Sequence, residues 1–411
     1  MRSIKYIQDV VDWGLCVGCG ACYSVCKKEA VSLEDIESVG IRPKFKKEIC
    51  LDCTDCLFGC PGYCIDVRKN GNNSDHRSYE NLLIGRTLEV WEGYAADEDI
   101  RYKGSSGGLL TALALYCLEK ENMKFVLHTG MHAEKPWKNI TVKSRTRNEL
   151  LARTGSRYIV SSPCDSLKWI EDSDRPCVFI GKPCDAAAVS ELRKIRPNLD
   201  ENLGLVLTFF CAGTPSTRAT LDLLEKLDVR SETIQGLYYR GNGWPGGFAV
   251  LDEDGKREEL LPYMESWSFL QKYRAFRCHL CPDGMGELGD ISCGDAWHRY
   301  DKDREDSGLS LAIVRSSHGK QILHRAMDAG YVELKRSSPI NVVKAQQLVE
   351  RRMEIFGRQL AMRLLFIPTT RFLGFSLFKC WLKTPVIVKI KSILGTLRRL
   401  LQRGLWHRNP V

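Results

Sequence analysis

The chain reads Cys16-Val-Gly-Cys19-Gly-Ala-Cys22-Tyr-Ser-Val-Cys26 and, further on, Cys50-Leu-Asp-Cys53-Thr-Asp-Cys56-Leu-Phe-Gly-Cys60-Pro61. Both runs have the spacing C-x2-C-x2-C-x3-C. In proteins with two 4Fe–4S clusters, the fourth cysteine of each such run ligates the other cluster. The spacing therefore predicts one cluster on Cys16, Cys19, Cys22 and Cys60, and a second on Cys50, Cys53, Cys56 and Cys26. Zinc is the alternative, but structural zinc sites usually combine separated cysteine pairs.

The composition indicates a multi-domain protein of a reducing compartment. A length of 411 residues favours two or three domains. Of the 18 cysteines, twelve fall in groups with ligand spacing, which argues for metal and against disulfides. The first residues contain no apolar run typical of a signal peptide, and we find no apolar run long enough to span a membrane. These features predict a cytoplasmic protein.

The positive charge is concentrated at the C-terminal end. From Phe356 onward there are eleven Lys or Arg and no acid, so the rest of a chain whose net charge is +9 carries −2. Nucleic-acid binding by the body of the protein is therefore disfavoured. Basic residues alternate with bulky apolar ones, which predicts amphipathic helices that contact an anionic membrane, at its inner face, or an acidic partner. A solvated tail that packs on the body is the alternative.

A linker and a change of pattern divide the chain. Residues 69–78 are polar and turn-forming, which predicts a linker. From residue 89 onward, apolar segments predict alternating strands and helices. We expect strands at residues 90–95, 125–130, 177–180 and 204–210, and helices at 109–116, 185–195 and 215–227. Such alternation is typical of an α/β domain with a parallel sheet.

Two turn-rich segments of this domain have the composition of a phosphate site. The Ser/Gly loop at residues 104–108 leads into an apolar helix, whose unpaired N–H groups suit a phosphate, although an ordinary serine N-cap explains it equally well. Residues 153–163 add two arginines and several hydroxyls. The G-x-G-x-x-G match at residues 241–246 contains Pro245 and precedes a strand-like run, which favours a hairpin or substrate-side loop over a dinucleotide fingerprint.

Four further cysteines have positions that suit a cofactor. Cys184 and Cys211 each follow a predicted strand, at the sheet edge where open α/β sheets bind ligands. Cys278 and Cys281 form a C-x2-C pair, which alone is equally typical of zinc, a redox pair or half a cluster site. Together the four predict a third 4Fe–4S cluster, with a zinc or redox pair and two buried thiols as the alternative.

Several segments, in order, resemble the coenzyme F-420 hydrogenase/dehydrogenase beta-subunit family. They are Ser106-Gly107-Gly108-Leu109-Leu110-Thr111, Thr154-Gly155-Ser156-Arg157-Tyr158 with Ser162-Pro163, Phe179-Ile180-Gly181-Lys182-Pro183-Cys184, Phe210-Cys211, and residues 277–292. The N-terminal run resembles bacterial-type ferredoxins. The resemblance implies an α+β ferredoxin-like domain at residues 1–68 and a linker at 69–88. An α/β flavoprotein domain at 89–350 would follow. The charge pattern, and not the resemblance, predicts the basic helical tail at 351–411.

The resemblance also implies cofactors and roles. It assigns FAD to a site formed by Ser106, Gly107, Gly108, Gly155, Ser156, Arg157, Ser162 and Pro163, and a cluster to Cys184, Cys211, Cys278 and Cys281. Lys182, His128 and Arg240 are candidates to orient an anionic substrate, although a lone histidine is more often structural. The implied activity is electron transfer between clusters, FAD and a hydride carrier such as coenzyme F-420, with ferredoxin or a catalytic subunit as redox partner. The alternative is a relay subunit without a substrate of its own.

Overall fold

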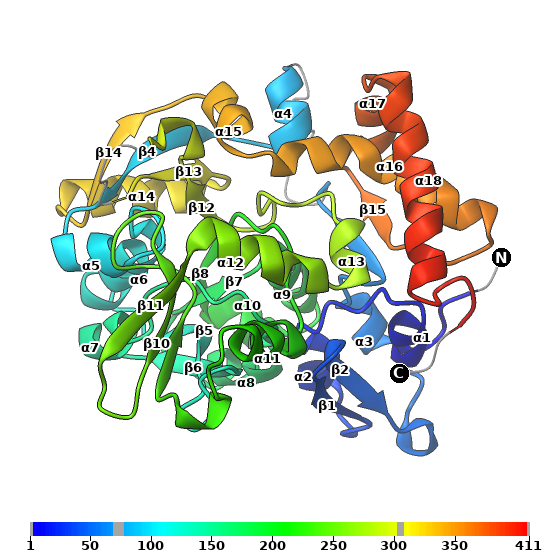
Figure 1. The fold of residues 1–411 in the computed structure, drawn as a ribbon, viewed down its shortest axis with the longest axis horizontal. Helices are drawn as coiled ribbons and strands as arrows, with labels where there is room; N and C mark the ends of the chain where they lie inside the picture. Colours follow the sequence, from blue (N-terminus) through cyan, green and yellow to red (C-terminus); the bar gives the residue numbers. More distant parts are fainter. Residues whose placement is uncertain (1–2, 69–77, 302–307, 409–411) are drawn as a thin grey trace.

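The computed structural model describes residues 3–68, 78–301 and 308–408 (Figure 1). Its centre is a mixed sheet of eight strands in the order β14-β4-β13-β12-β8-β7-β5-β6. The strands are β4 (Glu89–Ala95), β5 (Val126–Met131), β6 (Asn139–Ser144), β7 (Cys177–Gly181), β8 (Leu203–Phe209), β12 (Ile291–Asp295), β13 (Ser310–Val314) and β14 (Val332–Arg336). The predicted strands are present, and the domain is α/β.

The sheet is parallel only in its middle. Strands β5, β7, β8 and β12 run parallel to one another, whereas β6, β13, β4 and β14 extend the sheet by antiparallel pairing. The expectation of a parallel sheet was therefore wrong for both edges. The reason at one edge is local, since β6 follows β5 through a short loop that suits a hairpin better than a crossover.

Helices cover both faces of the sheet because its buried strands are apolar on both sides. One face packs against α6 (Leu109–Glu119) and α14 (Ser317–Asp328). The other packs against α8 (Lys168–Glu171), α9 (Pro183–Leu192) and α10 (Pro197–Asn202), and nearer β13 against α4 (Tyr79–Ile84), α15 (Pro339–Ala345) and α16 (Leu348–Leu364). Within β7, Val178 points to the first face and Phe179 to the second.

A small antiparallel sheet lies beside the large one. It contains β9 (Gly236–Tyr238), β10 (Gly247–Leu251) and β11 (Arg257–Pro262), and it packs against α11 (Thr217–Lys226) and α12 (Tyr263–Leu270). Residues 241–246 connect the antiparallel strands β9 and β10. This confirms the prediction of a hairpin loop at the G-x-G-x-x-G match.

The N-terminal segment forms a lobe of short elements that packs on the body. They are α1 (Ile7–Asp12), α2 (Ala21–Val25), α3 (Asp55–Phe58), the antiparallel pair β1 (Val31–Ile36) and β2 (Gly40–Phe45), and β3 (Cys64–Asp66). Of the predicted linker, residues 69–77 lie outside the described residues and α4 occupies 79–84. Helices α5 (Glu98–Lys103), α7 (Arg147–Leu151) and α13 (Phe276–His279) complete the body.

The C-terminal segment packs on the body and completes the N-terminal lobe. After α16 come β15 (Arg371–Leu373), α17 (Leu377–Leu382) and α18 (Val386–Gln402). Strand β15 pairs in parallel with β3, and Leu400 and Leu405 join the core that contains Cys16 and Cys60. Figure 1 shows this segment in orange and red beside the blue N-terminal lobe. In the described residues, no helix combines the length and the hydropathy needed to cross a bilayer.

Candidate redox site

A cavity of about 790 Å³ opens at the carboxyl ends of the parallel strands. Lys182 follows β7, Cys211 follows β8, Asp295 ends β12, and the start of α6 closes one side. Open α/β sheets bind ligands at this edge because the loops that follow parallel strands converge there. The volume falls within the range of about 300–1,000 Å³ that is usual for small-molecule and cofactor pockets.

Most residues predicted to bind FAD line this cavity. Those that do are Ser106, Gly108, Gly155, Ser156 and Arg157. Gly107, Ser162 and Pro163 are not in the lining, and Ser161 lies there instead. The backbone N–H of Gly107 donates to Ser310 Oγ at 2.7 Å, so an internal bond already uses it. Helix α6 begins after Gly108, which is left-handed with a φ of 73°, and no side chain caps its first turn.

The two arginines singled out by sequence are held by protein oxygens. Arg157 donates to the carbonyl of Leu237 at 2.8 Å and to the side chain of Asn139. Arg240 does not line the cavity: its Nη2 lies 2.7 Å from Asp295 Oδ1, and its side chain is 1% exposed. Sequence could not anticipate this pairing because Asp295 is 55 residues away. Arg240 therefore supports the cavity wall from behind.

Lys182 and His128 do line the cavity, but both have internal partners. Lys182 Nζ donates to Ser161 Oγ at 2.9 Å and lies 2.8 Å from Asp185 Oδ2. Burial lowers the pKa of Lys182, but the charges of Asp185 and Cys184 outweigh burial and raise it overall. His128 Nε2 lies 2.8 Å from Ser144 Oγ, and burial, with Arg153 nearby, lowers its pKa to about 4. Lys182 is thus a buried cation and His128 a neutral imidazole at neutral pH.

The four cysteines predicted to hold the third cluster come together beside the cavity. Burial raises the pKa of the Cys184 thiol, and the neighbouring Cys211 and Cys281 thiols raise it further. Burial also raises the pKa of Cys211 to about 12, with Cys278 and Cys281 adding to the effect. Of the four, Cys211 lines the cavity. Thiols separated by up to 97 residues of sequence therefore lie near one another, and all four cysteines are half-buried.

The two N-terminal runs exchange their fourth cysteines. Burial raises the pKa of Cys60, and its neighbouring thiols Cys19 and Cys16 belong to the first run. Burial likewise raises the pKa of Cys56 to about 11, with contributions from Cys53, Cys50 and Cys26. The spatial groups are thus Cys16, Cys19, Cys22 with Cys60, and Cys50, Cys53, Cys56 with Cys26. Cys53 is exposed, whereas Cys16, Cys19, Cys22 and Cys60 are buried.

Short contacts connect these groups. Helix α13, which carries Cys278, packs through Phe276 into the core that contains Cys16, Cys22 and Cys60. The neighbouring Arg277 is buried and donates to the carbonyl of Pro61 at 3.0 Å. The three cysteine groups therefore form a series. It begins with the group of the exposed Cys53, continues with the group of Cys16 and Cys60, and ends with the group of Cys278 beside the cavity.

Sequence reasoning left several cavity residues unassigned. Cys293, Asp295, Tyr263, Trp267 and Trp297 all line the cavity. The rings of Tyr263 and Trp297 stack with centroids 5.8 Å apart at 6°. These residues come from β12, α12 and the turn after β12, which only the fold brings together. Another unassigned thiol, Cys164, is buried beside the first group, and its backbone N–H donates to the carbonyl of Cys19 at 3.0 Å.

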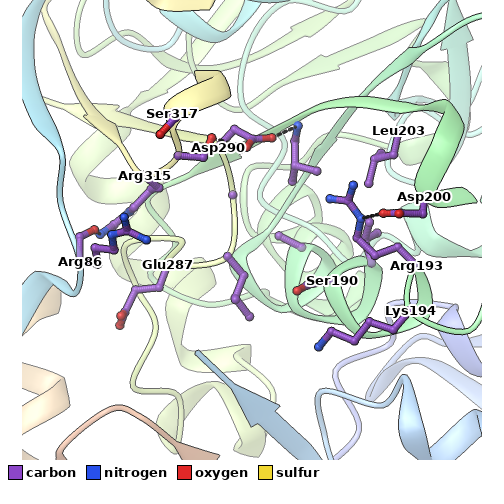
Figure 2. A pocket seen from close by; sticks show the side chains of 16 residues that line it. Arg86, Ser190, Arg193, Lys194, Asp200, Leu203, Glu287, Asp290, Arg315 and Ser317 are labelled. Carbon is purple, nitrogen blue, oxygen red and sulfur yellow. Dashed lines mark hydrogen bonds and ion pairs between the residues drawn. The ribbon is translucent and has the colours of Figure 1, made fainter. Parts of the chain in front are cut away.

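A second cavity, of about 530 Å³, lies at the amino ends of β8 and β12. It is lined by Arg86, Ser190, Arg193, Lys194, Asp200, Glu287, Asp290 and Arg315, among others (Figure 2). Its charges are largely committed to structure: Arg193 pairs with Asp200, and Asp290 accepts from the backbone N–H of Val206 at 2.8 Å. No residue predicted to bind a cofactor lines it.

A single-ion site such as zinc is absent from the described residues. Across 3–68, 78–301 and 308–408, no three His, Cys, Asp or Glu side chains lie close enough to share one metal ion. The thiol groups are near enough to interact electrostatically.

Family models match three parts of the chain. Residues 90–168 match the model described as coenzyme F420 hydrogenase/dehydrogenase, beta subunit N-term, and residues 174–339 match its C terminus. Residues 9–32, which hold the first cysteine run, match a 4Fe–4S binding domain. The resemblance inferred from the sequence is confirmed, and so is iron–sulfur binding.

Similar proteins and a solved structure indicate the same family as the family models do. The chain is 25% identical to coenzyme F420 hydrogenase subunit beta of Methanosarcina barkeri over 64% of this chain and 86% of that one. It is 22% identical to coenzyme F420-dependent sulfite reductase of Methanocaldococcus jannaschii over 87% of this chain, but spans only 52% of that protein. A chain of the F420-reducing [NiFe] hydrogenase complex from Methanosarcina barkeri shares the fold, with a TM-score of 0.54 over 71% of this chain and 97% of that one, at 22% identity. The chain therefore belongs to the coenzyme F420 hydrogenase/dehydrogenase beta-subunit family and is an iron–sulfur oxidoreductase.

Proposed function

We propose that this protein is an iron–sulfur flavoprotein that passes electrons between a redox partner and a small-molecule hydride carrier. When bound, 4Fe–4S clusters would carry single electrons and FAD would exchange one or two, which connects cluster chemistry with hydride chemistry. The observation that carries the proposal is the series of three cysteine groups that begins at the exposed Cys53 and ends at Cys211 in the cavity wall.

The donor sets suit clusters. Each group offers four thiols, and burial together with mutual repulsion raises the pKa of Cys22, Cys60 and Cys184. Bound iron would compensate this repulsion, because a metal ion inverts the local pKa balance and deprotonates its thiol ligands. Arg351 adds positive charge near the third group, since it lowers the pKa of Cys281 in opposition to burial. We propose that Cys184, Cys211, Cys278 and Cys281 hold the third cluster, and that the two N-terminal groups hold one each.

The cavity suits FAD. The uncapped first turn of α6 faces it and favours a phosphate anion. Arg153 also lines the cavity and adds positive charge. Thr154 Oγ1 is buried there without a hydrogen-bond partner among the described residues, as expected of a group that awaits a polar ligand. We assign Ser106, Gly108, Gly155 and Ser156 to the cofactor, while Arg157 fixes the loops that shape its site.

The protein's own groups would set the environment of the ring. Tyr263 and Trp297 offer a flat apolar wall that excludes water. Lys182 supplies a buried positive charge, and His128 supplies a neutral imidazole. We propose that Lys182 orients an anionic group of the carrier, such as coenzyme F420. A relay subunit that docks a catalytic partner is the second candidate, favoured by the exposed Cys53 at the end of the series.

Release of the bound cofactor with acid tests whether the protein binds FAD. We expect a fluorescent supernatant with about one FAD per chain, and a lower content in Ser156→Trp, which narrows the cavity. Ser231→Trp, which changes a serine that does not line the cavity, should keep the wild-type content. A colourless supernatant from iron-loaded wild type would overturn the FAD assignment. If F420H2 reduces the bound flavin without any partner protein, the protein is an enzyme with its own substrate. If the flavin is reduced only through a partner protein, the protein is a relay subunit.

We propose that the C-terminal segment brings the protein to a membrane surface. Its basic residues, without any acid from residue 356 onward, support peripheral contact of an otherwise cytoplasmic protein with an anionic membrane.

A further inference from the structure

Helix α18 packs on the protein with its polar side. Its buried residues are Ser392, Thr396 and Leu400, which recur every four positions and so lie on one face. This face meets α16 so closely that a Cβ added at Gly357 would lie 2.2 Å from Ser392 Oγ. Small side chains thus permit a tight contact between α18 and α16, and five large apolar side chains of α18 stay exposed.

The apolar side of α18 faces solvent. We call Val386, Ile387, Ile390, Leu394 and Leu401 the outward face; these side chains are 51–69% exposed. A helix that packs on a body normally buries its apolar face and exposes its polar one. In α18 large apolar side chains are exposed and small polar ones are buried. An exposed apolar surface of this kind indicates a binding site for another molecule or for a membrane. Figure 1 shows α18, in red, crossing α16 beside the N-terminal lobe.

The charges around the outward face identify what covers it. Lys383, Lys391 and Arg398 are exposed on α18 or just before it. A second copy of the chain would bring two acid-free basic segments together, so self-association through this face is opposed by repulsion. An anionic bilayer offers both an apolar layer and negative headgroups, as amphipathic interfacial helices require.

We infer that α18 lies along an anionic lipid surface, with the outward face inserted at the level of the acyl chains. This inference rests on the proposed membrane contact and names the surface that makes it. Lys391 and Arg398 would then reach lipid phosphates beside the inserted row. Exposed Phe366 and Trp406 of the same C-terminal segment add further apolar side chains near the basic residues.

Vesicle sedimentation of the full-length iron-loaded protein tests the inference. Wild type should pellet with mixed phosphatidylglycerol–phosphatidylcholine vesicles, less with pure phosphatidylcholine, and less at high salt. The triple variant Ile387→Gln/Ile390→Gln/Leu394→Gln should lower the partition coefficient at least about tenfold. The matched variant Ile140→Gln/Ile195→Gln, which changes two exposed isoleucines of the body, should bind as wild type does.

The outcomes separate the two levels of the proposal. Equal pelleting of wild type and triple variant would overturn the role of the outward face while leaving the membrane contact in place. No pelleting of wild type with either vesicle would overturn the membrane contact itself and favour an acidic protein as the partner. Unchanged iron content and thermal midpoint in the triple variant would show that its fold is intact.

Discussion

Arg240 and Asp295 show how single residues hold the cavity wall in place. Their guanidinium and carboxylate meet at 2.7 Å, and Trp244 Nε1 donates to the same carboxylate at 2.9 Å. The Arg240 guanidinium carbon also lies 4.3 Å from the centre of the Tyr263 ring. From behind the cavity wall, Arg240 thus fixes Asp295 and the aromatic ring of Tyr263, which line the cavity.

Removing one partner of this pair should be costly. Arg240→Met leaves Asp295 without its buried counter-charge, and we expect a loss of about 3–5 kcal/mol in the free energy of unfolding. Lys168→Met breaks an exposed pair with Asp172 and should cost about 1 kcal/mol or less. Thermal midpoints of both variants provide the measurement. Equal midpoints would show that the buried pair does not hold the wall.

His128 should make stability depend on pH. Its pKa is about 4 in the folded protein, because of burial and Arg153, against about 6.5 for a free histidine. The unfolded chain therefore binds a proton first, so stability is full above about pH 6.5 and falls as the pH drops towards 4. At pH 5 we expect protonation of His128 in the unfolded chain to lower the free energy of unfolding by about 2 kcal/mol.

The pH dependence can be assigned by substitution. The thermal midpoint should fall less between about pH 7.5 and pH 5 in His128→Asn than in wild type, because Asn does not titrate. An identical fall in both proteins would mean that other groups cause it.

Elements distant in sequence complete one another in this fold. Strand β3 finds its partner in β15, and Thr370 Oγ1 donates to the carbonyl of Gly62 at 2.7 Å. The predicted strands and helices of the α/β domain were recognisable because apolar residues mark them continuously. The β3–β15 pair was not, because each strand has three residues and some 300 residues separate them.

The contact between α18 and the N-terminal lobe gives an element-scale prediction. Leu400 is fully buried in the core that contains Cys16, Cys22 and Cys60, whereas the adjacent Leu401 is 66% exposed. Leu400→Ala should cost about 2–5 kcal/mol and speed the thermal loss of cluster absorbance. Leu401→Ala is the matched control and should behave as wild type. Equal rates of bleaching would contradict a role of α18 in the lobe.

At the scale of the whole molecule, the sequence indicated which cysteines group together in space, and their role as cluster ligands stays a prediction. Spacing alone suggested the exchange of Cys26 and Cys60 between runs, and strand ends suggested the place of Cys184 and Cys211. The partners of Arg157 and Arg240 could not be predicted, because they lie on strands distant in sequence that only the folded sheets bring near. The outward face of α18 was equally hidden, since periodicity shows that a helix is amphipathic but not which side faces the body.

The central claim is that a third cluster joins the N-terminal clusters to the cavity, and iron content tests it most directly. Three cubanes require about 12 iron atoms per chain, and anaerobic Cys281→Ala should retain about 8 because only the third cluster is lost. Cys293→Ala should keep about 12, since burial alone raises the pKa of Cys293 to about 12 and no other thiol contributes. About 8 iron atoms in wild type, unchanged in Cys281→Ala, would contradict the third cluster.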